Sequence, residues 1–280
     1  MADSTKKYTH FNVTFPREYV AHIETNRPEK LNSFYQPMWL ELRTILDTLS
    51  HSPDVRALIL SGAGPRAFTA GLDVKAASTS LFAKDESLDG ARVAARLRRD
   101  VLEFQDCVTA LERCEKPVIV VMHGISFGLG IDLATAADIR ICARDVRFSV
   151  KEVDIGLAAD VGSLSRLPKV VGHFGWVKEV CLSAREFGAE EAARVGFVNS
   201  VHESKEAAIQ AGLDLAVSIA SKSPVAVQGT KELLNWSRDH SVQDGLRYTG
   251  VWNSAALQTK DISAALFSGI EKRTPTFEKL

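Results

Sequence analysis

Three acidic residues in otherwise apolar surroundings are the side chains in this sequence best suited to acid–base chemistry. Asp132 lies in GIDLATA, Glu152 in SVKEVDIGL and Asp160 in LAADVGSL. Burial raises the pKa of a carboxyl group and a nearby like charge raises it further, which suits such groups to proton transfer near neutral pH. Each acid also has a structural alternative: complementing a helix dipole for Asp132, a strand end for Glu152 and a helix cap for Asp160.

Two further segments have the composition of turns that present backbone N–H groups to an anion. Phe68-Thr69-Ala70-Gly71-Leu72-Asp73 and Phe127-Gly128-Leu129-Gly130 each combine glycine with the start of an expected helix. The first N–H groups of a helix have no partner within it, and the helix dipole is positive at that end. Two such donors from separate loops would form an oxyanion hole.

A third pattern points to different chemistry. Residues 124–128, GISFG, match the G-x-S-x-G nucleophile elbow of serine hydrolases, with Ser126 as nucleophile. Gly-rich turns between a strand and a helix are common, so this short match is weak on its own. The histidines that follow it, and could complete a triad, are His173, His202 and His240. Dinucleotide-binding, P-loop and zinc-ligand motifs are not found in the sequence, so no metal or cofactor is expected.

The elements that must position these residues alternate between strands and helices in the first half of the chain. An apolar stripe at helical spacing predicts a helix over 32–50 and a second over 91–114. Apolar β-rich runs predict strands at 19–25, 54–60, 117–123, 138–142 and 147–150. Residues 76–90 are polar and aperiodic, which predicts a mobile loop. After about residue 161 helical patterns dominate, so the expected class is α/β with a C-terminal helical part.

Composition excludes several classes of protein. The chain has 280 residues, 45% of them hydrophobic, and its 34 basic and 35 acidic residues give a formal net charge of −1. This balance excludes a disordered chain and gives no attraction to nucleic acid. No apolar run is long enough to span a membrane, and the four cysteines suggest free thiols rather than a disulfide scaffold.

Longer segments around these residues resemble the crotonase (enoyl-CoA hydratase/isomerase) superfamily over most of the chain. The features shared with the whole superfamily are RPEKLNS at 27–33, AFTAGLD at 67–73, KPVI at 116–119 and the Gly-rich turn that ends in Asp132-Leu133. Other segments are closest to the Δ(3,5)-Δ(2,4)-dienoyl-CoA isomerase branch: VKEVDIGLAADVG at 150–162, RLPKV at 166–170 and SKSPVAVQG at 221–229.

The resemblance implies a fold and a division of the chain. The crotonase (ClpP-like) fold is a spiral of ββα units followed by a C-terminal helical region. Residues 1–205 are then the spiral core with the acyl-CoA site, and residues 206–280 are a helical trimerisation region.

The resemblance also implies roles for individual residues. The catalytic acids of the family fall on Asp132, Glu152 and Asp160, and the oxyanion N–H donors fall on Leu72 and Leu129. Hydratases have Gly at position 160, so an acid there indicates the dienoyl isomerase. The family commonly has Gly at position 129, so Leu129 is a departure that raises the question of local backbone geometry. The implied substrate-binding residues are Ala70, Gly71, Leu72, Asp73, Val74 and Leu129.

The expected reaction is the conversion of a 3,5-dienoyl-CoA to a 2,4-dienoyl-CoA in fatty-acid β-oxidation, with CoA as part of the substrate. We expect Glu152 to act at C2 and Asp160 at C6, with Asp132 orienting or tuning one of them. The alternatives on the same fold are 2-enoyl-CoA hydratase and Δ3-Δ2-enoyl-CoA isomerase. A catalytically silent acyl-CoA-binding protein is a further alternative.

The resemblance implies assembly and location as well. We expect a homotrimer or homohexamer, with apolar side chains of the last third of the chain at the interface or in the core. The C-terminal Glu278-Lys279-Leu280 differs by one residue from the S-K-L peroxisomal signal. The expected location is peroxisomal, with mitochondrial or cytoplasmic as the alternatives.

Overall fold

From β3 to β8, consecutive strands of the chain alternate between two sheets. A computed structural model describes residues 7–79 and 87–280, and within them the larger sheet has the order β1-β2-β3-β5-β7-β10 and the smaller sheet β4-β6-β8-β9. All neighbouring pairs are parallel except β1–β2 and β8–β9. The strands are β1 (Phe11–Arg17), β2 (Val20–Thr25), β3 (Ala57–Gly62), β4 (Ala67–Thr69), β5 (Val118–Met122), β6 (Ile125–Phe127), β7 (Ile139–Ala143), β8 (Arg147–Ser149), β9 (Phe187–Gly188) and β10 (Ser200–His202).

Each turn of the chain adds one strand to each sheet and then a helix, which is the expected spiral of ββα units. β3 and β4 are followed by α2 (Val74–Thr79) and α3 (Gly90–Arg113), and β5 and β6 by α4 (Leu129–Ala136). β7 and β8 lead into the 3₁₀ helix η2 (Glu152–Ile155), α5 (Ser163–Val170) and α6 (Phe174–Ser183). The α/β spiral predicted from the sequence is therefore confirmed.

The central strands are apolar without alternation because both faces of the larger sheet are covered. Leu58 and Val120 point into the main core, with α1 (Gln36–Ser50) among the helices that contribute to it. Ile59 and Ile119 point to the other face, where α8 (Lys205–Ala220) packs. The two faces together fix the spiral whose turns carry the candidate site.

Helix α3 departs from its predicted role in one respect. The predicted stripe along this helix is buried in the core only in its C-terminal half, at Phe104, Val108 and Leu111. Val101 and Leu97, one and two turns before Phe104, line a cavity, which Phe104 also borders. The loop predicted at 76–90 is also partly wrong, because α2 extends to Thr79 and α3 begins at Gly90; residues 80–86 lie outside the described residues.

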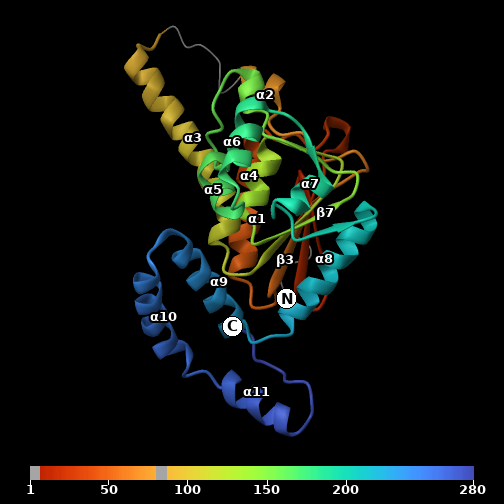
Figure 1. Cartoon of the computed structure of the whole chain (residues 1–280), viewed down its shortest axis with the longest axis vertical. Coiled ribbons are helices and arrows are strands. Elements are labelled where there is room, and N and C mark those ends of the chain that lie inside the picture. The colour runs from red at the N-terminus through yellow and green to blue at the C-terminus, as the bar shows by residue number, and fades with distance from the viewer. Residues whose placement is uncertain (1–6, 80–86) are drawn as a thin grey trace.

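The C-terminal helices extend away from the sheets, as Figure 1 shows. α9 (Pro224–Asp239) and α10 (Val242–Ala256) pack against each other, and α11 (Asp261–Ile270) follows. The remaining short helices are η1 (Pro28–Lys30) and α7 (Ala189–Arg194). The division of the chain into a spiral core with the acyl-CoA site (1–205) and a helical trimerisation region (206–280) stays a prediction. Over 7–79 and 87–280, no helix is long and apolar enough to cross a membrane.

Candidate active site

One cavity of about 390 Å³ brings together all three acids and both expected N–H donors. Its walls are the N-terminal end of α4, the segment around Leu72, the middle of α3, η2 and the loop before α5. Asp132, Glu152, Asp160, Leu72 and Leu129 all line it. The residues singled out from three separate parts of the sequence therefore share one site.

The peptide N–H of Leu72 points away from the strand-like segment beside it. Phe34 donates its N–H to the carbonyl of Gly71 (2.8 Å) and accepts a hydrogen bond from the N–H of Asp73 (2.7 Å), forming a parallel bridge. In such a bridge the middle residue, Leu72, directs its own N–H to the opposite side. That side is the cavity that Leu72 lines.

Leu129 supplies the second N–H as the first residue of α4, where backbone donors lack partners within the helix. The presence of Leu rather than Gly at position 129 raised the question of local backbone geometry. The unusual conformation lies at the preceding residue, Gly128, which has φ 52° and ψ −112°. Leu129 therefore adopts helical geometry without strain and is buried. A Cβ on Gly71 would lie 3.6 Å from the Leu129 nitrogen, so the two donor loops are in contact.

Gly128 should not tolerate a side chain. A Cβ there would lie 3.1 Å from Oε1 of Glu152, in a backbone region that L-residues avoid. We expect Gly128→Ala to lower the free energy of unfolding by about 1–3 kcal/mol and to reduce turnover, because the helix start and Glu152 must both shift. Urea unfolding and steady-state kinetics would measure both effects. Gly172→Ala is the matched control, since nothing lies within 4 Å of its Cβ position; equal behaviour of the two variants would contradict this reading.

Asp132 is buried in the first turn of α4 and held by one residue. Its Oδ1 accepts hydrogen bonds from the N–H (2.6 Å) and the hydroxyl (2.7 Å) of Ser163, at the start of α5. Burial raises the pKa of Asp132 to about 6, against the hydrogen bonds from Ser163 and the charge of Arg166. The carboxyl group is thus fixed in place, whereas complementing a helix dipole requires only its charge.

Glu152 begins η2, with a carboxyl oxygen that has no protein partner. Its Oε2 is buried without a hydrogen bond from any described residue. Burial raises the pKa of Glu152 to about 7, and the nearby charge of Asp132 adds to this increase. A buried carboxyl group that lacks a partner, faces a cavity and titrates near neutrality has the properties of a general base.

The raised pKa of Glu152 predicts a pH-dependent stability effect. Between its ordinary pKa of 4.5 and about 7, the folded protein retains a proton that the unfolded chain releases, so stability falls as pH rises through this range. Because Gln does not ionise, we expect Glu152→Gln to be more stable than the wild type by about 1–3 kcal/mol at about pH 8. The difference should vanish at about pH 4, below the unfolded pKa. Urea denaturation at both pH values tests this, and equal stabilities at the higher pH would contradict it.

Asp160 lines the cavity from the segment between η2 and α5 and is exposed to solvent. Desolvation raises its pKa above the ordinary value. It is not the helix cap that the sequence allowed, because Gly162 occupies the N-cap position of α5. Its backbone carbonyl instead accepts a hydrogen bond from Nε2 of Gln105 on α3 (2.5 Å). This acid can therefore exchange protons with solvent while facing the cavity.

The expected substrate-binding segment divides into two parts. Ala70, Gly71, Leu72 and Val74 line the cavity, as does Leu129. Asp73 turns away from it: its carboxylate accepts hydrogen bonds from the N–H of Ala76 at the start of α2 and from Arg27 (2.9 Å). Asp73 therefore shapes the Leu72 loop. Ser163 and the α3 residues of the wall were not singled out from the sequence, because single serines and helix faces carry no motif.

The structure contradicts the serine-hydrolase alternative. Ser126 lies within strand β6, is fully buried, and is not among the residues that line the acid-bearing cavity. The histidines that could have served it are engaged elsewhere: His173 caps α6, His202 contacts Ser200 and His240 contacts the carbonyl of Trp236. A nucleophile elbow requires an exposed hydroxyl on a sharp turn, which this serine does not provide.

Comparison with known proteins agrees with this arrangement. Residues 16–279 match the model of the family described as enoyl-CoA hydratase/isomerase. The chain is 44% identical over 280 residues to the mitochondrial Delta(3,5)-Delta(2,4)-dienoyl-CoA isomerase of Mus musculus, covering 99% of this chain and 85% of the relative. It is 41% identical to the peroxisomal protein of the same name from Arabidopsis thaliana, covering 93% of both chains. The crystal structure of an enoyl-CoA hydratase from Bacillus anthracis superposes with a TM-score of 0.87 at 28% identity, covering 96% of this chain and 99% of that one. This chain therefore belongs to the enoyl-CoA hydratase/isomerase family.

Proposed function

We propose that this protein is a Δ(3,5)-Δ(2,4)-dienoyl-CoA isomerase acting in fatty-acid β-oxidation. The observation that carries the proposal is the presence of a third acid, Asp160, in the cavity that holds Glu152 and the two N–H donors. A reaction at one carbon needs a single acid–base site. Proton transfer between two distant carbons of one acyl chain needs two, because one short side chain cannot reach both. The relatives of highest identity reported above carry the name of this activity.

The proposed reaction moves one proton and changes no oxidation state. A base removes a proton from C2 of the 3,5-dienoyl thioester, and the electron pair spreads through the conjugated chain onto the thioester oxygen. An acid then delivers a proton to C6, which leaves double bonds at C2 and C4. The base afterwards releases its proton to solvent and the acid takes one up, which restores both groups for the next turnover. The N–H groups of Leu72 and Leu129 stabilise the oxygen where negative charge develops, each contributing about 2.7–4 kcal/mol by comparison with other oxyanion holes. Because the step balances without an oxidant or reductant, the proposal includes no resident cofactor.

Geometry supports Glu152 as the base at C2 and Asp160 as the acid at C6. Glu152 Oε1 lies beside Gly128, which directly precedes the Leu129 donor, so Glu152 is near the thioester end of the cavity. Asp160 lies toward α3, whose apolar side chains Leu97 and Val101 line the cavity and suit an acyl tail. In this proposal Asp132 acts on Glu152 through its charge, which raises the Glu152 pKa toward neutrality.

Substrate comparison tests this proposal against the other activities of the family. The purified protein should convert 3,5-octadienoyl-CoA to the 2,4-isomer, followed by the ultraviolet absorbance of the conjugated thioester. It should turn over 2-octenoyl-CoA and 3-octenoyl-CoA far more slowly. Faster hydration of 2-octenoyl-CoA would identify a hydratase, and no turnover of any of the three would identify a binding protein.

Assembly into trimers or hexamers is part of the proposal. The C-terminal helices expose large apolar side chains: Leu246, Leu257 and Phe267 are 65%, 63% and 60% exposed. Burying such side chains in an interface would stabilise an assembly. Trp236 and Tyr248 already pack between α9 and α10 (ring centroids 4.6 Å apart), so they hold this helical pair together. Analytical ultracentrifugation would distinguish a monomer from a trimer or hexamer.

For location we propose the peroxisome, with mitochondria as the alternative. The proposal rests on the C-terminal Glu278-Lys279-Leu280, which differs from the signal S-K-L at one position. One relative is named as peroxisomal and another as mitochondrial. Imaging a fluorescent protein fused at the N-terminus, with and without the last three residues, would test the signal.

A further inference from the structure

We infer that Arg166 is a positioning residue for the proposed isomerisation, holding the loop that carries Asp160 and Ser163 against helix α3. This inference rests on the proposed function and adds a residue for which the sequence suggested no role. Arg166 does not line the acid-bearing cavity and is not expected to touch the substrate. It would act through the acids on the loop before it and in α4.

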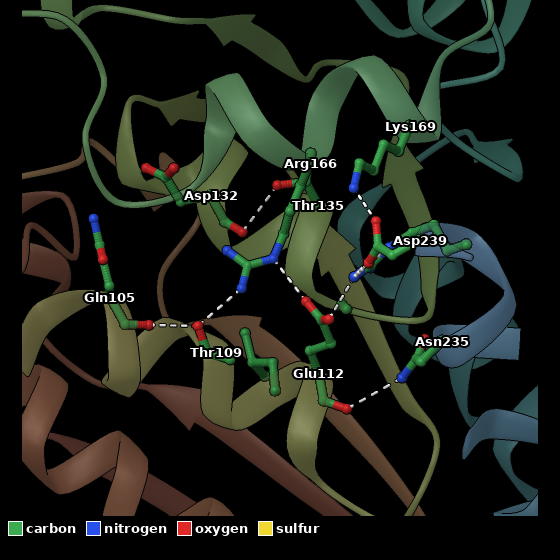
Figure 2. A network of polar contacts seen from close by, with 12 residues as sticks. Gln105, Thr109, Glu112, Asp132, Thr135, Arg166, Lys169, Asn235 and Asp239 are labelled. Carbon is green, nitrogen blue, oxygen red and sulfur yellow. Dashed lines mark hydrogen bonds and ion pairs between the residues drawn. The ribbon is translucent and has the colours of Figure 1, made fainter. Parts of the chain in front are cut away.

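The first observation is a partly buried set of contacts between Arg166 and α3. Its Nε donates to Oε2 of Glu112 (2.7 Å) and its Nη2 donates to the hydroxyl of Thr109 (2.8 Å). The side chains of Arg166 and Glu112 are only 12% and 19% exposed. Figure 2 shows the Arg166 guanidinium between these two residues of α3. A charge-assisted pair shielded in this way is stronger than one on an open surface.

The second observation connects the guanidinium to the backbone that holds Asp132. Gly162 has φ 151°, and a Cβ there would lie 2.2 Å from Nη1 of Arg166 and 3.8 Å from Oδ1 of Asp132. The guanidinium and the carboxylate therefore both lie close to this glycine. The next residue, Ser163, donates both its N–H and its hydroxyl to Asp132. Holding Gly162 in this conformation thus determines where the Ser163 donors point.

A third contact fixes the same loop two residues earlier. Gln105 on α3 donates to the carbonyl of Asp160, and the hydroxyl of Thr109 donates to the carbonyl of Gln105 (2.6 Å). The segment from 160 to 166, which includes the first turn of α5, is consequently attached to α3 at both ends. Since α3 also forms a wall of the cavity through Leu97 and Val101, these contacts set the position of Asp160 relative to that wall.

Arg238, which binds the other carboxylate oxygen of Glu112, offers a matched control for Arg166. Oε1 of Glu112 accepts a hydrogen bond from Nη2 of Arg238 on α9 (2.6 Å), and Arg238 also pairs with Asp239. Arg238 thus binds the same carboxylate as Arg166 but has no contact with the 160–163 loop among the described residues. Replacing it perturbs the Glu112 pair without touching the proposed positioning contact.

The experiment compares kcat, KM and pH profiles of variants with 3,5-octadienoyl-CoA. We expect Arg166→Met to lower kcat about 10- to 100-fold with KM changed less than about threefold, because the acids are misplaced while the binding loops remain. The limb of the kcat profile that reports ionisation of Glu152 should move to lower pH, because losing the cation raises the pKa of Asp132, and a neutral Asp132 no longer raises the pKa of Glu152. Arg166→Lys keeps the charge but not the fork of donors, so it should restore the wild-type profile and only part of kcat. Arg238→Met should match the wild type in both readouts.

The pH profile of kcat depends on the titratable and charged groups that surround Asp132 and Glu152. Arg166 and Asp160 act on Asp132, and Asp132 and Asp160 act on Glu152. Cys181 on α6 stays neutral, because burial raises its pKa to about 11. The other charged residues that line the cavity are Lys151 and Asp154, which pair with each other, and Asp100 on α3.

The outcomes separate the inference from the proposed function. A wild-type protein that does not isomerise the dienoyl substrate overturns the proposed function itself. An active wild type with an Arg166→Met variant of unchanged kcat and pH profile overturns only the inference, as does an equal loss in Arg238→Met. If Arg166→Met does not fold, Arg166→Lys decides: a reduced kcat at wild-type melting temperature supports the inference, and wild-type kcat overturns it.

Discussion

Asp160→Asn should lose dienoyl-CoA isomerisation by about 10²- to 10⁴-fold while still exchanging the C2 hydrogens of the substrate with solvent. The amide cannot deliver a proton to C6, so the dienolate cannot complete the reaction. Glu152 and the Leu72 and Leu129 donors are untouched, so the proton at C2 can still leave and return. Incubation in D₂O with detection by NMR would show deuterium at C2 of unreacted 3,5-octadienoyl-CoA.

The folded state of this variant should be intact, because Asp160 is exposed and accepts the hydrogen bond from Gln105 through its backbone carbonyl, which the substitution does not change. Asp106→Asn is the matched control: this acid is on α3 and pairs with Arg43 and Arg113 outside the cavity. It should isomerise at the wild-type rate. Wild-type turnover in Asp160→Asn would remove Asp160 from the mechanism, and loss of C2 exchange along with turnover would reverse its assignment to C6.

Glu152→Gln should abolish both reactions, with isomerisation and C2 exchange each falling by about 10³-fold or more. Gln cannot accept the C2 proton, and Glu152 is the acid whose carboxyl oxygen lies beside Gly128 at the thioester end. In the wild type the base must be ionised, and its pKa is raised to about 7. The rate of the wild type should therefore follow a bell-shaped pH profile, because Glu152 must be ionised to act as the base while Asp160 must be protonated to act as the acid.

Two measurements distinguish the loss of the base in Glu152→Gln from a loss of folded structure. Glu152→Gln should be at least as stable as the wild type, for the reason given by its raised pKa. Glu186→Gln, which alters an exposed acid paired with Arg147, should leave activity unchanged. Isomerisation by Glu152→Gln within about tenfold of the wild type would exclude Glu152 as the base.

The acids and N–H donors could be proposed from the sequence because they stand in long, specific segments. GIDLATA, SVKEVDIGL and LAADVGSL each place an acidic residue among largely apolar neighbours. The alternation of strands and helices predicted an α/β core with a C-terminal helical part, and the resemblance to the crotonase superfamily implied the spiral of ββα units. The same reasoning could not decide whether Asp160 was a cap or a cavity residue, since both roles accept an acid at that position.

What the sequence could not provide depends on contacts between distant residues. Arg166 meets Glu112 and Thr109 across more than fifty positions of chain, and no local pattern signals such a pairing. The stripe on α3 illustrates the same limit: its periodicity predicts one apolar face but not that Leu97 and Val101 line a cavity while Val108 and Leu111 enter the core. The sequence also does not show which residue adopts an unusual backbone conformation. The question of local backbone geometry arose at Leu129, but the structure places the unusual conformation at Gly128, the residue before.

The path of the proton is the most direct test of the account. The wild-type protein should be mixed with 3,5-octadienoyl-CoA in D₂O and the product examined by NMR. Because Asp160 is exposed, its carboxyl proton exchanges with solvent before transfer, and the 2,4-octadienoyl-CoA formed should carry one deuterium at C6. A 3-hydroxyacyl product, deuterium at C4 in place of C6, or unreacted substrate would contradict a two-acid transfer from C2 to C6.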